Sequence, residues 1–185
     1  MEIEESTQSV ESIEDELAEV KKELRQYLTF VLGGEEYGFD ILRVQEIRGW
    51  DSPTVIPNTP EYIKGVLNLR GSIVPVVDLR QLFRLESVNY DDSTVVIVVH
   101  IKVGDDDSEE TKDKVMGMVV DGVSDVFDVD VEAIRPAPDF NGVVSSDFVV
   151  GLATAVEKMV VLIDIDHLVN HGVMRDISTN KRRLS

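Results

Sequence analysis

The sequence predicts an all-β fold, arranged either as barrels or as a sandwich. Short runs rich in valine, isoleucine and aromatic residues recur at intervals of about 8–12 residues once the first 26 residues are passed. Glycine-containing turns separate them, and the strands do not alternate with helices as they do in a doubly wound parallel sheet. With 185 residues, of which 43% are hydrophobic, the chain is long enough to bury a core.

Charge and composition exclude several classes of function. The 36 acidic and 18 basic residues give a formal net charge of -18, which would repel nucleic-acid phosphates and anionic lipid headgroups. Cysteine is absent, which excludes disulfides, thiolate metal sites and a cysteine nucleophile. No uninterrupted apolar run is long enough to span a bilayer, and the N-terminus lacks the basic and apolar regions of a signal peptide. We therefore expect a cytoplasmic protein that neither binds nucleic acid nor inserts into a membrane.

Residues 1–26 form an acidic segment with the pattern of an amphipathic helix. It contains nine acidic and three basic residues and neither glycine nor proline. Five apolar side chains share one helical stripe, which suits docking onto a surface or pairing with another helix. The alternative is a frayed extension that lies on the body of the protein, because a stripe this short is a weak coiled-coil signal. The stripe consists of Val10, Ile13, Leu17, Val20 and Leu24.

Residues 27–50 contain three predicted strands. Runs at 27–32 and 35–41 are separated by Gly33-Gly34, a dipeptide that favours a tight hairpin turn. A third extended run covers 44–50. The loop that follows contains three prolines, which prevent it from continuing as a helix or as a central strand.

A second hairpin is predicted next. Its strands, 65–69 and 72–77, are apolar and β-branched and are separated only by Arg70-Gly71. Asp78 is then placed to cap a short helix over 79–85. At such a turn Arg70 would project a guanidinium group from a rigid scaffold, which suits protein recognition. The alternative is that Arg70 pairs with a carboxylate such as Glu46 and closes the end of the hairpin.

The second half of the chain is again predicted to be rich in strands. The polar stretch 86–93 separates two lobes, 27–88 and 94–165, and a closing helix is expected over 166–173. The acidic stretch 104–113 is interpreted as a solvated loop, because it lacks the ligand spacing and the flanking helices of an EF-hand. A basic, flexible tail is expected over 174–185, with Lys181, Arg182 and Arg183. The predicted strands of this half are 94–103, 114–121, 123–131, 147–156 and 158–165.

The residues give no positive indication of catalysis. Phosphate-binding glycine loops and a nucleophile elbow are absent from the sequence. His167 and His171 are four residues apart, with Asp164 nearby, so a helix would place both imidazoles on one face, as zinc sites require. An HExxH motif and a clear third ligand are missing, which leaves a metal-dependent β-barrel hydrolase as the alternative from a different class. We expect no catalytic residue, no metal and no cofactor.

Several segments in a fixed order resemble one family, the CheW-type coupling proteins of bacterial chemotaxis. The resemblance extends over about residues 26–169, and the order of the segments makes a chance match improbable. The segments are Val44-x-Glu46-Ile47, Pro57-x-x-Pro60, Gly65-Val66-x-Asn68-Leu69-Arg70-Gly71, Ile73-Val74-Pro75-Val76-Val77-Asp78-Leu79, Gly117-Met118-Val119-Val120-Asp121-Gly122-Val123 and Leu162-Ile163-Asp164-Ile165-Asp166.

The resemblance implies two intertwined, five-stranded, SH3-like barrels that share a core within a domain covering 27–173. It also implies a non-enzymatic adaptor that links chemoreceptors, the methyl-accepting chemotaxis proteins, to the histidine kinase CheA. The partners would be the regulatory domain of the kinase and the cytoplasmic hairpin tip of the receptor, and the protein would be recruited to membrane-associated receptor arrays. The alternative within this fold is a scaffold for a different receptor–kinase pathway.

Carried over by position, the resemblance also implies a binding surface. The receptor- and kinase-binding residues would be Val44, Glu46, Gly65, Asn68, Arg70 and Gly71, with Asn68 holding the turn. Ile41 and Ile47 would line an apolar groove together with Val44, into which the apolar stripe of a helical receptor hairpin could fit. The N-terminal segment and the acidic stretch 104–113 are longer than the family requires.

Overall fold

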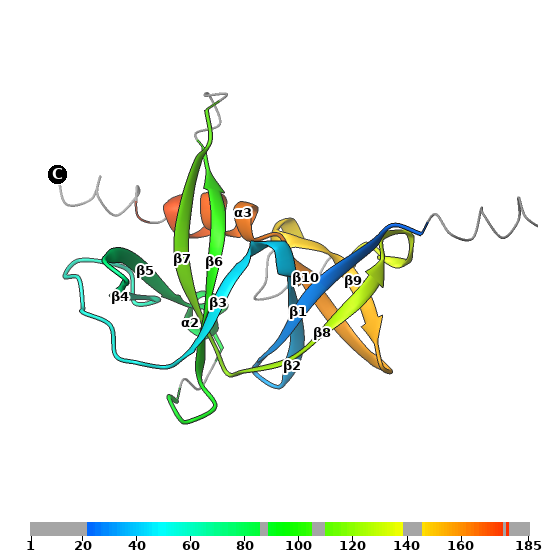
Figure 1. The fold of residues 1–185 in the computed structure, drawn as a ribbon, viewed down its shortest axis with the longest axis horizontal. Coiled ribbons are helices and arrows are strands. Elements are labelled where there is room, and N and C mark those ends of the chain that lie inside the picture. Colours follow the sequence, from blue (N-terminus) through cyan, green and yellow to red (C-terminus); the bar gives the residue numbers. More distant parts are fainter. Residues whose placement is uncertain (1–21, 86–88, 105–109, 139–145, 176, 178–185) are drawn as a thin grey trace, which may run out of the picture.

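The computed structural model describes residues 22–85, 89–104, 110–138, 146–175 and 177. Ten strands account for most of this part of the chain, and only short helices connect or close them (Figure 1). The strands are β1 (Leu24–Leu32), β2 (Glu35–Asp40), β3 (Val44–Gly49), β4 (Ile63–Leu69), β5 (Ser72–Asp78), β6 (Val95–Val103), β7 (Lys112–Val120), β8 (Gly122–Asp130), β9 (Val149–Ala155) and β10 (Lys158–Ile163). The helices are η1 (Ile41–Arg43), α2 (Leu79–Leu82), η2 (Val131–Ala133), η3 (Ser146–Phe148), α3 (Ile165–His167) and η4 (Leu168–Val173).

The strands form two five-stranded sheets, and each sheet takes strands from both halves of the chain. Sheet A has the order β8-β1-β2-β10-β9, and sheet B has the order β3-β6-β7-β5-β4. The predicted all-β fold is therefore confirmed, but the sheets do not follow the predicted lobes 27–88 and 94–165. The reason is long-range pairing: β2 pairs in parallel with β10 in sheet A, and β5 pairs in parallel with β7 in sheet B.

Each sheet surrounds its own apolar cluster, and a larger cluster lies between the two sheets. The sequence of strand β6 is almost continuously apolar because both faces of the strand are buried. Val96 and Val98 point into the cluster of sheet B, whereas Ile97 and Val99 point into the shared cluster. The shared cluster also contains Phe30 and Phe39 from sheet A, whose ring centroids are 4.5 Å apart. The two sheets therefore have a common core, as expected.

The start of the domain differs from the prediction. Leu24 was assigned to the helical stripe, but it begins β1 and pairs with Asp130 of β8. Arg25 and Gln26 continue the same antiparallel ladder. Inter-strand hydrogen bonding thus overrides the local helical pattern at residues 24–26, while the rest of the predicted helix, residues 1–21, lies outside the described residues.

The predicted turn at Gly33-Gly34 and the predicted helix cap at Asp78 take the expected form, and a second cap, at Asp164, was not predicted. Gly33 and Gly34 both have positive φ, and the hairpin between β1 and β2 turns there. The side chain of Asp78 accepts hydrogen bonds from the backbone nitrogens of Arg80 and Gln81 and so begins α2, although this helix ends at Leu82 instead of residue 85. Asp164 caps α3 in the same way, through the backbone nitrogen of His167.

The C-terminal helix is longer and less regular than predicted. It begins at Ile165, changes to a π-helix over Leu168–Val173, and continues through Met174 and Arg175. Met174 and Ile177 pack against the shared cluster, so the beginning of the predicted tail is part of the packed domain. Residues 178–185 lie outside the described part, as do 105–109 of the acidic stretch, where β7 already begins at Lys112.

Candidate docking surface

The turn between β4 and β5 holds Arg70 in a fixed, projecting position. Arg70 and Gly71 have φ values of 51° and 87°, as a two-residue hairpin turn with two left-handed positions requires. The backbone nitrogen of Gly71 donates a hydrogen bond of 2.9 Å to Oδ1 of Asn68, which confirms that Asn68 holds the turn. An arginine is an unusual residue for a left-handed position, so the turn is built at some conformational cost.

Arg70 is paired and exposed at the same time. Its Nη2 lies 2.7 Å from Oε2 of Glu46, so the predicted pairing with Glu46 is confirmed. The side chain of Arg70 nevertheless remains 81% exposed, against 20% for Glu46. The ion pair joins β3 to the turn that follows β4, and β3 and β4 are the two edge strands of sheet B; most of the guanidinium group still faces outward. An exposed pair of this kind adds little to stability, about 0–1 kcal/mol.

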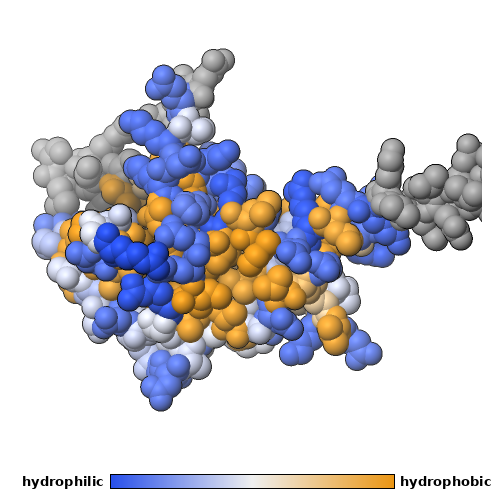
Figure 2. Space-filling view, viewed as in Figure 1, coloured by the Kyte–Doolittle hydropathy of each residue, from blue (hydrophilic) through white to orange (hydrophobic). Residues whose placement is uncertain are grey.

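The three residues predicted to line an apolar groove lie along η1 and β3. An irregularity in the pairing of β3 with β6 falls between Val44 and Glu46; beyond it, Ile47 pairs with Ile97. Ile41 and Val44 pack against the shared cluster, whereas Ile47 remains 45% exposed. Figure 2 shows hydrophobic side chains gathered over the middle of this face, where Figure 1 places β3 on the side of sheet B next to sheet A.

Sequence reasoning missed the most exposed apolar residue of this region. Leu42, in η1, is 84% exposed. It directly follows Ile41 and precedes β3, so it extends the apolar surface toward the start of β1. The only signal in the sequence was its place in a run of apolar residues next to the predicted groove.

Gly65 has a different position from the other predicted site residues, because it is buried. A Cβ atom at this position would lie 2.0 Å from the backbone oxygen of Thr54, and its φ is 132°. The proline-containing loop crosses β4 here, where Thr54 and Val66 exchange two backbone hydrogen bonds of 2.9 Å each. Gly65 therefore allows two backbone segments to pack closely, which is a structural reason for a glycine at this point of the motif.

A buried charge network lies next to this sheet and was not predicted. The side chain of Arg80 is 2% exposed and that of Asp78 is fully buried. Nε and Nη2 of Arg80 donate to the two oxygens of Asp78 at 3.1 and 2.9 Å, and Nη1 donates to Oδ1 of Asp121 at 3.1 Å. Nη1 also donates to the backbone oxygen of Asn89 at 2.7 Å. The sequence had indicated Asp78 only as a helix cap.

Aromatic rings complete the network. Tyr90 donates its hydroxyl hydrogen to Oδ2 of Asp78 at 2.8 Å, and its ring lies 4.8 Å from the guanidinium of Arg80 and stacks on Trp50. Burial, the hydrogen bond and the charge of Asp78 together raise the pKa of Tyr90 above its usual value. Burial alone would lower the pKa of Arg80, but hydrogen bonds and charges from Asp78 and Asp121 outweigh it and raise this pKa.

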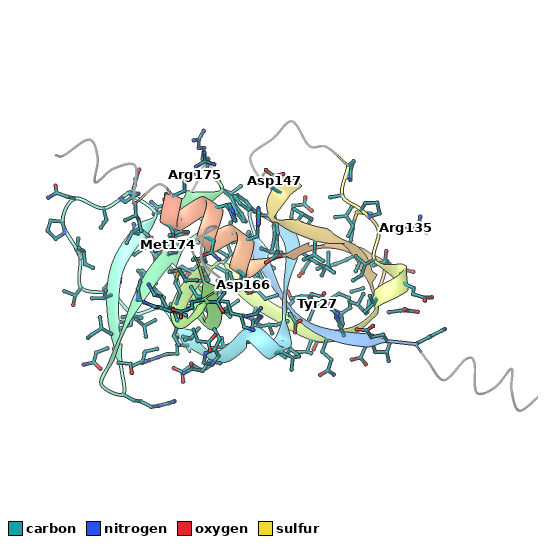
Figure 3. The ribbon with its side chains drawn as sticks, turned by 90° about the horizontal axis from the view of Figure 1, so that it is seen from above. Tyr27, Arg135, Asp147, Asp166, Met174 and Arg175 are labelled. Carbon is teal, nitrogen blue, oxygen red and sulfur yellow. The ribbon has the colours of Figure 1, made fainter. Side chains whose placement is uncertain are left out.

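A second anchor attaches the C-terminal helix to the start of β3. Asp166, labelled with Met174 and Arg175 along this helix in Figure 3, forms an ion pair with Arg43 of η1. Oδ1 of Asp166 also accepts a hydrogen bond of 2.7 Å from the backbone nitrogen of Lys102 in β6. The carboxylate of Asp166 therefore holds the C-terminal helix against β6 of sheet B and against Arg43, the residue that follows Leu42.

The histidines considered for a metal site do not form one among the described residues. The rings of His167 and His171 stack with their centroids 4.1 Å apart, and Phe148 lies beside His167. Asp164 uses its side chain to cap the helix. Within the ranges that the structure covers, no group of three or more His, Asp or Glu side chains is arranged to hold a metal ion.

The fold is that of a β-rich protein of two five-stranded sheets, and comparisons with known proteins identify its family. The CheW-like domain family matches residues 26–173. The chemotaxis protein CheW of Klebsiella aerogenes is 49% identical over 150 residues, which cover 81% of this chain and 84% of that protein. The chemotaxis protein CheW of Rhizobium meliloti is 32% identical over 142 residues, covering 77% of this chain and 85% of the relative.

A solved structure gives the same result. The crystal structure of the scaffolding protein TtCheW from Thermoanaerobacter tengcongensis superposes with a TM-score of 0.68 and 33% sequence identity. The match covers 80% of this chain and 89% of the other. The chain belongs to the CheW-like domain family, and it is a scaffold-type chemotaxis protein, not an enzyme. None of the described helices is both long and apolar enough to cross a membrane.

Proposed function

We propose that this protein is an adaptor that couples chemoreceptors to the histidine kinase CheA in a chemotaxis signalling array. Membership in the CheW-like domain family is the observation that carries the proposal, since relatives across 80% of the chain are named chemotaxis or scaffolding proteins. A scaffold of this kind works by binding, so its activity depends on exposed side chains held in fixed positions. Arg70 is such a side chain.

Two parts of the surface support different modes of binding. Ile47 and Leu42 are exposed apolar side chains beside Ile41 and Val44, and this strip suits the apolar face of a helical hairpin such as a receptor tip. The β4–β5 turn, with Arg70 held by Glu46, presents a cation with several free donors and suits an acidic group on a protein partner. Asn68 and Gly71 contribute by fixing the turn, and Gly65 by fixing the loop that covers β4.

The regulatory domain of CheA and the cytoplasmic hairpin tip of a receptor are the proposed partners. Residues 27–173 would form the docking domain, with the acidic N-terminal segment before it and the basic tail after it. The protein would work in the cytoplasm and reach membrane-associated arrays through its partners. The strongly negative net charge favours protein partners over direct contact with anionic lipids.

The decisive experiment is a titration of the protein, as wild type and as Arg70→Glu, against each partner fragment. We expect the wild type to bind and the variant to bind at least about tenfold more weakly to one of the partners, because it places a carboxylate where a cation is presented. Arg84→Glu is the matched control. Arg84 is also exposed and also has a positive φ, 56°, so it reproduces the change in charge and in backbone preference at another place.

The possible results separate the role from the site. Binding that both variants leave unchanged would contradict the assignment of Arg70 but not the coupling function. No binding of the wild type to either fragment would contradict the coupling function itself and direct attention to another receptor–kinase pathway. Circular dichroism of each variant distinguishes a lost contact from a lost fold.

A further inference from the structure

Sheet B carries a second apolar groove, beside the β4–β5 hairpin whose turn carries Arg70. It has a volume of about 560 Å³ and lies between the β4–β5 hairpin, β7 and the C-terminal helix. Ile73 and Ile56 on its walls are 64% and 40% exposed. Among the described residues, its lining also includes Lys114, Val115, Met174 and Ile177.

The charge of this groove is unusual for this chain. Although 36 of the 185 residues are acidic, none of the described lining residues is, and Lys114 is the one charged side chain among them. Ile177, which also lines the groove, precedes Lys181, Arg182 and Arg183 by only a few positions in the sequence. The groove therefore suits an apolar ligand that carries negative charge at its edges.

The chain itself contains a segment of this chemistry. Residues 1–21 include eight acidic residues and a single lysine, together with four apolar residues of the helical stripe. Laid in an apolar groove as a helix, this segment would bury its apolar stripe and leave its acidic side chains at the edges, where Lys114 offers a cation. The C-terminal segment 178–185 is a poor occupant in comparison, because Leu184 is its only large apolar residue. The four stripe residues are Val10, Ile13, Leu17 and Val20.

The start of β1, to which the N-terminal segment is attached, and the groove lie at opposite ends of the molecule. In Figure 1, β1 begins at one end of the long axis and β4 and β5 lie at the other. A continuous helix of 21 residues would be about 32 Å long at 1.5 Å per residue. A compact chain of this size has a radius of gyration of about 16 Å, hence a diameter of roughly 40 Å, so a segment that stays one continuous helix would not place its stripe in the groove of its own domain.

We propose that the acidic N-terminal segment of one copy docks its apolar stripe into the β4–β5 groove of a second copy. The contact joins two different surfaces, so it is heterologous: each molecule can give one segment and accept another. The interaction is independent of any receptor or kinase, and its affinity depends on the apolar stripe and on the apolar lining of the groove with Lys114.

Self-association of the full-length chain tests this proposal. Sedimentation velocity from about 1 µM to about 1 mM covers the affinity range of weak helix-in-groove contacts, and we expect the average mass of the wild type to rise with concentration. Ile73→Glu, which blocks the groove, and Ile13→Glu/Leu17→Glu, which blocks the stripe, should each weaken association at least about tenfold.

Two matched control variants add the same number of carboxylates as the blocking variants, but outside the groove and the stripe. Met159→Glu adds one carboxylate at a 61% exposed position on β10, in the other sheet. Ser12→Glu/Ala18→Glu adds two carboxylates to the N-terminal segment but away from its stripe. Both control variants should associate as the wild type does.

A mixing experiment gives the sharpest outcome. The groove variant retains an intact stripe and the stripe variant retains an intact groove, so an equimolar mixture should form mixed dimers although each variant alone remains monomeric. A wild type that stays monomeric at all concentrations, or a mixture that does not associate, would overturn the proposal. Association that survives both blocking variants would overturn it equally.

Discussion

Replacing Arg80 by methionine should destabilise the domain more than any other loss of a single charge. Methionine keeps much of the length of the side chain but removes all the donors that reach Asp78, Asp121 and the backbone oxygen of Asn89. The carboxylate of Asp78, which is fully buried, would then lose its cation. Only the hydroxyl of Tyr90 and the backbone nitrogens of α2 would remain as its hydrogen-bond donors.

The expected magnitude follows from this geometry. Removing one partner of a buried ion pair typically costs about 3–5 kcal/mol, because the other charge stays buried without compensation. The total free energy of unfolding of a domain is about 5–15 kcal/mol, so this loss is a large fraction of it. Urea unfolding followed by circular dichroism measures the difference.

Two comparisons show whether burial is the cause. Arg25→Met removes an ion pair with Glu23 whose side chains are 50% and 67% exposed, and it should leave the free energy of unfolding almost unchanged. In a double-mutant cycle with Asp78→Asn, the two losses should not add, since the charge left behind by the first change is removed by the second. A loss below about 1 kcal/mol for Arg80→Met, or strict additivity in the cycle, would refute the reasoning.

Two further predictions follow from the same part of the fold. Gly65→Ala should lower the free energy of unfolding by about 2–4 kcal/mol, because the added Cβ would meet the backbone oxygen of Thr54 and the φ of Gly65 is left-handed. Gly49→Ala is the control: nothing lies within 4 Å of its added Cβ, so the free energy of unfolding should change by no more than about 0.5 kcal/mol. Urea unfolding compares the two variants. The pKa of Tyr90 is raised in the folded state, so its contribution to stability is complete below its ordinary pKa of about 10 and is lost as the pH rises through the raised value. Tyr90→Phe should therefore show a smaller loss of stability in alkaline solution than the wild type, measured by unfolding at a series of pH values; an equal slope would contradict this.

The features that could be predicted from the sequence are those that depend on a few neighbouring residues. Gly33-Gly34 and Arg70-Gly71 mark tight turns because their backbone angles are local, and Asp78 marks a helix start because its side chain reaches the next turn. The ion pair between Arg70 and Glu46 was foreseen only as one of two alternatives. The structure shows that pairing and exposure occur together, because one guanidinium has more donors than one carboxylate can use.

The features that could not be predicted depend on which distant segments meet. Nothing in the alternation of β2 or β5 indicates that each pairs with a strand from the other half of the chain. Leu24 fits a helical stripe and is nevertheless a strand residue, because β8 supplies it with hydrogen-bond partners. Arg80 looks like a surface residue of a short amphipathic helix, and its burial depends on Asp121, 41 positions away. Propensity alone cannot decide such cases.

One residue shows how the two sheets are held in a fixed relation. Asp121 lies where the chain passes from β7 in sheet B to β8 in sheet A. Its backbone nitrogen donates to the oxygen of Val31 at 3.0 Å, its Oδ2 accepts from the nitrogen of Gly33 at 2.8 Å, and its Oδ1 accepts from Arg80. Bonds to the β1–β2 hairpin and to α2 thus meet at a single side chain, on one side of the shared core.

This arrangement matters for a scaffold more than it would for a simple binding module. A protein that holds two partners must fix the distance and the angle between its docking surfaces, and a hinge between the sheets would let both vary. The shared apolar core and the Asp78–Arg80–Asp121 network both oppose such a hinge, one by contact area and the other by directed hydrogen bonds. We therefore expect variants of this network to impair the simultaneous binding of two partners more than the binding of either one alone.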